Sequence, residues 1–122
     1  MPIQTRIISS GLDGTYPLRY GPAAMPTGSA AMVYEATDRS SVRQMTFANT
    51  TAGILHATVH IVSATGSASV GNQLIPTMEV PPNDTVPVKV AFVMNKGDRV
   101  FALADGAVNL MFNVYDREPG WL

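Results

Sequence analysis

Two histidines, His56 and His60, stand four residues apart in the segment 55–61. On a helix this spacing places both imidazoles on one face, where they can share a metal ion. The segment instead alternates apolar and polar residues, which predicts a β-strand. On a strand the two histidines lie about 13 Å apart, too far to bind one ion. We therefore interpret them as exposed or interface residues, and convergence of one histidine per chain on a symmetry axis stays open.

The serines and carboxylates are more typical of loops and turns than of a catalytic site. A small hydrolase would need a cleft that joins a histidine to an acid and a serine, and no Gly-x-Ser-x-Gly elbow frames any serine. Calcium could bind to Asp84, Asp98 and Asp105 if their loops gathered at one end, but turn contexts favour backbone capping. We expect no enzyme, no catalytic residues, no cofactor and no metal site.

The composition limits the remaining classes of function. The 122 residues are enough for one core, and the absence of cysteine excludes disulfides and thiolate zinc sites. Charged residues make up 14% of the chain, below the usual share of about a quarter. The surface is therefore poor in charge, and we expect partner molecules to cover part of it. The net charge of −1 and the scattered Lys and Arg residues argue against nucleic acid. No apolar run or signal layout indicates a membrane.

Short apolar/polar alternations separated by turn residues predict an all-β protein, an antiparallel β-sandwich or a jelly-roll-like fold. We expect strands at 30–36, 42–49, 54–62, 74–80, 85–93, 98–104 and 107–115. Pro87 places the start of its strand at a sheet edge. Asp105-Gly106 predicts a hairpin with a type I′ turn, and the small polar residues of 63–73 predict a flexible loop.

Three segments are expected along the chain: an extended N-terminal arm at 1–29, a β-sandwich domain at 30–116, and a C-terminal tail at 117–122. Glycine and proline interrupt the arm every few residues, so its apolar side chains need another surface to cover them. Most aromatic residues fall on the inward phase of strands, which favours a core over a sugar-stacking platform. Trp121 is the exception, because Pro119 and Gly120 leave it beyond any strand. The predicted interface residues are Ile7, Ile8, Tyr16, Leu18, Tyr20, Trp121 and Leu122.

Five segments occur in a recognisable order: x-Val-x-x-Met-x-Phe-x-Asn-Thr at 41–50, Thr-Val-x-Ile-Val at 58–62, Gly-Asn-Gln-Leu-Ile-Pro at 71–76, Pro-Asn-Asp-Thr at 82–85, and Lys-Gly-Asp-Arg-Val at 96–100. The set, which covers roughly residues 30 to 115, resembles the small β-sandwich modules of virion proteins in tailed bacteriophages. Such modules occur in tail, tail-fibre and capsid-associated components. The resemblance implies a structural protein with no catalytic residues.

The expected function is therefore that of a non-enzymatic virion structural protein. It would self-associate, preferably as a trimer, and dock on the particle as a capsid decoration or cement protein, or as a neck or tail accessory. Its partners would be further copies of itself and the major capsid or tail proteins, with assembly in the cytoplasm of the bacterial host. The alternative is a carbohydrate- or receptor-binding β-sandwich module of a tail fibre, which would use exposed aromatics and loop carboxylates.

Overall fold

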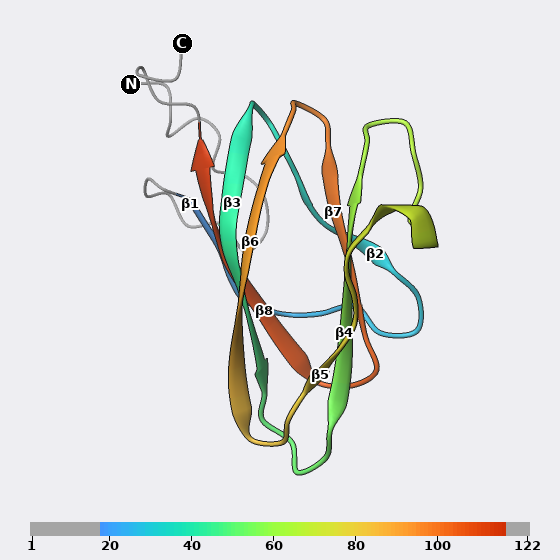
Figure 1. The fold of residues 1–122 in the computed structure, drawn as a ribbon, viewed down its shortest axis with the longest axis vertical. Coiled ribbons are helices and arrows are strands. Elements are labelled where there is room, and N and C mark those ends of the chain that lie inside the picture. The colour runs from blue at the N-terminus through green and yellow to red at the C-terminus, as the bar shows by residue number, and fades with distance from the viewer. Residues whose placement is uncertain (1–17, 117–122) are drawn as a thin grey trace.

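The computed structural model describes residues 18–116, which form eight β-strands and one short 3-10 helix (Figure 1). Each of the seven expected strands is present, with boundaries within two residues of those predicted, and β1 is additional. The elements are β1 Leu18–Ala24, β2 Ala31–Glu35, β3 Ser40–Asn49, β4 Leu55–Val62, η2 Val70–Asn72, β5 Gln73–Val80, β6 Asp84–Met94, β7 Arg99–Ala104 and β8 Val108–Asp116. No helix within these residues is long and apolar enough to cross a membrane.

The strands form two four-stranded sheets that pack face to face (Figure 1). One sheet has the order β1-β8-β3-β6 and the other has the order β2-β7-β4-β5. Strand pairs are nested, since β1 pairs with β8, β2 with β7, β3 with β6 and β4 with β5, all antiparallel. This nesting is the topology of an eight-stranded jelly roll. The predicted all-β sandwich is confirmed.

The core lies between the two sheets and follows the period-two alternation of the sequence. In β3, Met45 and Phe47 are completely buried, and in β4 the inward residues Ala57 and Val59 are too. Each large apolar side chain removed from water in this way contributes about 1.5–3 kcal/mol to folding. The alternation therefore fixes which face of each strand points to the core.

The sandwich begins at Leu18, twelve residues before the predicted boundary at 30. β1 pairs with β8 through Leu18↔Val114 and Ala24↔Asn109, and Met25 after it is buried in the core. The register shifts between Tyr20 and Ala23, where glycine and proline interrupt the apolar alternation. Because of this irregularity, the sequence pattern does not predict the strand. Of the predicted arm, residues 1–17 lie outside the described residues, as does the tail at 117–122.

The hairpin predicted at Asp105-Gly106 is wrong. These residues connect β7 to β8, which lie in different sheets, and neither residue has a positive φ. A type I′ turn needs positive φ at both central positions, and its strands must pair with each other. The edge position of Pro87 is confirmed, because β6 is the last strand of its sheet.

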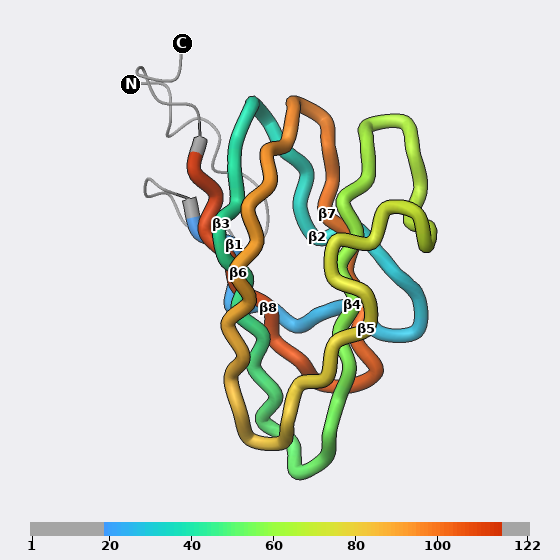
Figure 2. Tube along the Cα trace, viewed as in Figure 1, coloured from blue at the N-terminus to red at the C-terminus, as the bar shows by residue number. Residues whose placement is uncertain are grey.

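Figure 2 traces the loop between β4 and β5, for which the sequence predicts flexibility. Several hydrogen bonds hold this loop to the sandwich. The Arg99 guanidinium donates to the carbonyl oxygens of Ser63 and Gly66, at 2.8 and 2.5 Å. The Asn72 amide donates to the Ser67 carbonyl, at 2.8 Å. The loop backbone has no strand partner, and side chains from the strands and from the loop itself form hydrogen bonds to it instead. The composition of the loop does not predict these bonds.

Candidate functional site

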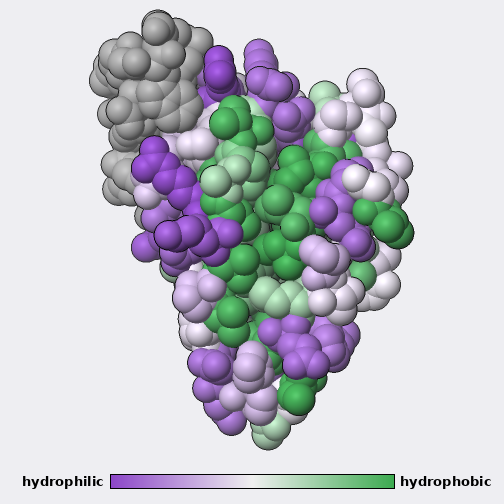
Figure 3. Space-filling model, viewed as in Figure 1, coloured by the Kyte–Doolittle hydropathy of each residue, from purple (hydrophilic) through white to green (hydrophobic). Residues whose placement is uncertain are grey.

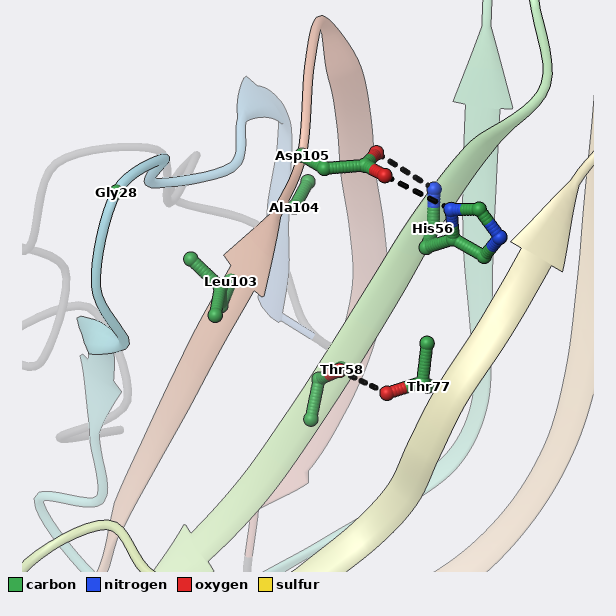
Figure 4. A pocket seen from close by; sticks show the side chains of 7 residues that line it. All are labelled: Gly28, His56, Thr58, Thr77, Leu103, Ala104 and Asp105. Atoms are coloured by element: carbon green, nitrogen blue, oxygen red, sulfur yellow. Dashed lines mark hydrogen bonds and ion pairs between the residues drawn. The ribbon is translucent and has the colours of Figure 1, made fainter.

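The outer face of the sheet β2-β7-β4-β5 carries a shallow depression of about 490 Å³ (Figure 4). Three neighbouring strands place its side chains, because Thr58 on β4 pairs in register with Leu103 on β7 and lies beside Thr77 on β5. Period-two alternation turns these residues outward, while Ala57 and Val59 turn inward. The lining comprises Gly28, His56, Thr58, Thr77, Leu103, Ala104 and Asp105.

His56 and Asp105 form a two-point contact at one end of this depression. One oxygen of Asp105 accepts a hydrogen bond from the His56 backbone N–H at 2.7 Å, and the other lies 2.8 Å from the imidazole Nδ1. The backbone hydrogen bond, followed by the bond from the ring, lowers the pKa of the Asp105 carboxyl. Because an ionised carboxylate only accepts hydrogen bonds, Nδ1 carries a proton and donates it to Asp105, while Nε2 points away from Asp105 (Figure 4).

The depression combines polar groups with an apolar wall. The hydroxyl oxygens of Thr58 and Thr77 lie 3.4 Å apart, and Leu103 lies beside them on β7 (Figure 4). Hydroxyls, an imidazole and an aliphatic surface are groups that hold a small polar ligand such as a sugar. The side chains of His56 and Asp105 are 41% and 52% exposed, so their polar atoms are accessible from solvent.

The second histidine has a structural partner of its own. His60 is buried, and its Nδ1 lies 2.9 Å from the Asn72 side-chain oxygen and 3.0 Å from the Ser69 carbonyl oxygen. Both partners are acceptors, so Nδ1 carries the proton and donates to the loop. No group of three potential metal ligands occurs within residues 18–116.

The other two aspartates considered for calcium cap turns, as predicted. Asp84 accepts from the Thr85 backbone N–H at 2.8 Å, and Asp98 accepts from that of Asn95 at 2.9 Å. Asp105 differs, because it bonds across 49 positions of sequence to another strand. The sequence shows no signal for this contact, which depends on the register between β4 and β7.

The predicted interface residues fall into two groups. Ile7, Ile8, Tyr16, Trp121 and Leu122 lie outside the described residues. Leu18 begins β1, and Tyr20 is only 6% exposed, stacked on Phe112 with ring centroids 4.9 Å apart. Tyr20 is therefore a core residue of its own sandwich rather than a surface contact, because its ring points between the sheets.

The described chain enters and leaves the sandwich at one corner. Leu18 pairs with Val114 and Ser40 pairs with Asp116, so β1 starts where β8 ends (Figure 1). The segments 1–17 and 117–122 are thus attached to neighbouring strands at the same end of one sheet.

No family model matches the chain, and no curated protein or solved structure matches it either. The jelly roll itself occurs in proteins of unrelated function. Function therefore has to be argued from the surfaces of this molecule.

Proposed function

We propose that this chain is a non-enzymatic structural protein of a tailed-phage particle, which self-associates and docks on the particle. The observation that supports it most is an apolar seam along one open side of the sandwich. The seam consists of Leu74 and Met78 on β5 and of Val86, Val88 and Phe92 on β6. In Figure 3 apolar side chains form a band between the two sheets on the side where β5 and β6 run.

The seam lies along the edges of the two sheets where β5 and β6 run. Five of the nine partly buried apolar residues that pack against the core belong to it. β5 and β6 are also the edge strands of their sheets, with backbone groups that lack a strand partner on the outer side. Apolar side chains beside unpaired strand edges favour contact with another chain.

The position of the chain ends supports the same proposal. Both flanking segments, which carry the apolar candidates Ile7, Ile8 and Trp121, are attached at the β1–β8 corner. This corner and the seam lie at opposite edges of the sheet β1-β8-β3-β6. Two separate contact regions allow each copy to touch two neighbours, as a trimer or larger ring requires. Burying Trp121 against a neighbour would contribute on the order of 2–3 kcal/mol per copy.

The proposed partners are further copies of this chain and the major capsid or tail proteins of the particle. The proposed location is the virion, after assembly in the cytoplasm of the bacterial host. In this role the rigid jelly roll is a spacer, and the seam and flanking segments provide adhesion.

Light scattering of the purified chain tests self-association. Three variants should be compared with the full chain: one that begins at Leu18, Val88→Glu in the seam, and Val70→Glu. Val70 is 84% exposed in the β4–β5 loop and provides the same chemical change outside the seam. We expect the full chain and Val70→Glu to be trimers or larger, and the other two to show lower mass. A monomeric full chain at all concentrations would contradict the proposal.

A second candidate function is a carbohydrate- or receptor-binding module, which the depression around His56 favours. Its hydroxyl pair and Leu103 offer hydrogen bonds beside an apolar wall, as sugar rings require. The loop carboxylates Asp84 and Asp98 are less suited to bind a sugar, because they cap turns. Binding to a glycan panel that Thr77→Val weakens and Asp84→Ala leaves unchanged would support it.

A further inference from the structure

A row of polar side chains crosses the outer face of the other sheet, β1-β8-β3-β6. Arg19 on β1 pairs with Asn113 on β8, and Gln44 on β3 pairs with Lys89 on β6. Arg43 stands beside Gln44, opposite Asn113, where the register between β3 and β8 shifts. The row therefore runs Arg19, Asn113, Arg43 and Gln44, and Lys89, across all four strands. It spans about 14 Å at the usual spacing of paired strands.

The bulge in β3 explains why two long polar side chains gather at the middle of the row. Val42 and Met45 are buried, whereas Arg43 and Gln44 between them are both exposed. In a regular strand one of these two residues would face the core. The extra residue instead adds a second polar side chain to the outer face.

The middle of the row is hollowed into a depression of about 300 Å³. Its described lining includes Arg43, Gln44, Lys89 and Asn113 from the row, together with Thr46 and Tyr115. No Asp or Glu is among these lining residues or in the row. The guanidinium of Arg43 lies over the Tyr115 ring, 4.3 Å from its centroid, which orients its donors without neutralising its charge.

We propose that this cationic row binds an anionic oligosaccharide, a sugar chain that carries carboxylate, sulfate or phosphate groups. Arg43 and Lys89 bind the oxyanions, since guanidinium and ammonium groups form strong charge-assisted hydrogen bonds to them. Gln44, Asn113 and Thr46 lie between or beside the cations and bond the sugar hydroxyls.

The same features favour a sugar chain over a nucleic acid. Proteins that hold single-stranded nucleic acid stack bases on open aromatic faces. Of the two aromatic residues in the described lining, Phe112 is buried in the core and Tyr115 is covered by Arg43. The net charge of −1 also provides no long-range attraction for a polyphosphate chain. The row instead places a few cationic side chains among amide side chains. This arrangement suits a sugar chain whose charged groups are separated by hydroxyls.

Isothermal titration calorimetry at low salt tests the proposal with four probes. An oligogalacturonate hexamer supplies carboxylates, a sulfated dextran hexamer supplies sulfates, a neutral dextran hexamer is the uncharged control, and a single-stranded oligonucleotide of equal charge represents nucleic acid. We expect at least one anionic sugar to bind and the neutral sugar not to bind. Binding should weaken about tenfold in Arg43→Gln and in Lys89→Gln, since each removes a charged hydrogen bond.

Lys96→Gln is the matched control, because Lys96 is an exposed lysine in the β6–β7 turn outside the row. It should bind like the unaltered chain, and circular dichroism verifies that all variants fold. NMR shift mapping on the unaltered chain should place the largest changes at Arg43, Lys89 and Asn113. Failure of both anionic sugars to bind, equal loss of affinity in Lys96→Gln, or tighter binding of the oligonucleotide would overturn the proposal.

Discussion

Asp105 holds His56 at two points, the backbone amide at 2.7 Å and the imidazole Nδ1 at 2.8 Å. The two residues lie at one end of the depression on the sheet β2-β7-β4-β5. Asp105 belongs to the connection that crosses from β7 to β8 in the other sheet. The contact therefore ties this crossing to the start of β4 and orients the imidazole at the same time.

This contact predicts a loss of stability in acid. The pKa of Asp105 is lowered in the folded protein from its ordinary value of 3.8, chiefly by the backbone hydrogen bond from His56. A lowered folded pKa contributes stability above 3.8 that is lost as the pH falls through the lower folded value. Urea unfolding from neutral to acidic pH should show this loss in the unaltered chain and a smaller one in Asp105→Asn. Asp84→Asn, in a local turn, is the control, and equal acid profiles for the two variants would contradict the assignment.

Gly21→Ala should destabilise the whole sandwich. Gly21 has a φ of +80°, and an added Cβ would overlap the carbonyl oxygen of Leu110 in the neighbouring strand β8. Strain and displacement of β1 together should lower the free energy of unfolding by about 2–3 kcal/mol. Gly53→Ala has open space and no positive φ, so it should change stability little. Equal urea midpoints for both variants would show that β1 is not integral to the fold.

Tyr20 should behave as a core residue. Tyr20→Ala should cost about 3–5 kcal/mol of stability, because it removes a ring packed on Phe112. Burial raises the pKa of Tyr20 above 10.0, so its contribution is present below that pH and is lost as the pH rises through the folded value. Tyr20→Phe should reduce this alkaline loss and leave the oligomeric mass unchanged. A change in mass without a change in alkaline stability would instead place Tyr20 at an interface.

Asn72 should control the order of the β4–β5 loop. Its side-chain oxygen accepts from the Ser69 N–H at 3.0 Å and lies 2.9 Å from His60 Nδ1. Asn72→Ala removes this acceptor and should accelerate amide hydrogen exchange in 63–72 roughly tenfold or more. Ser67→Ala is the control, since Ser67 bonds Asn72 through its backbone carbonyl. Similar exchange rates in the two variants would contradict this role.

The sequence predicts those features that depend on local pattern. Alternation in segments such as 55–61 identifies seven strands and their buried faces, because the side-chain period of a strand is two. The alternation does not predict β1, because Gly21 and Pro22 interrupt the apolar/polar pattern of this strand at a register shift. The turn residues at Asp105-Gly106 mark a change of direction correctly, but not whether the chain returns within one sheet or crosses to the other.

The candidate sites depend on which strands become neighbours, which one sequence does not specify. The His56–Asp105 contact joins residues 49 positions apart, and the cationic row draws on four strands of the sheet β1-β8-β3-β6. In the sequence Arg19, Arg43 and Lys89 are scattered, and their alignment follows only from the pairing registers. The net charge of −1 thus conceals a local concentration of cations.

The central claim, self-association through the seam, is tested most directly by distances between copies. The chain has no cysteine, so a single introduced cysteine carries a unique spin label. Ala91→Cys places the label on β6, at the seam side, and Ala31→Cys places it on β2, at the opposite open side of the sandwich. Electron–electron dipolar spectroscopy should give shorter distances between copies for the label at 91 than for the label at 31. Shorter distances at 31, or no coupling between copies at either position, would contradict association through the seam.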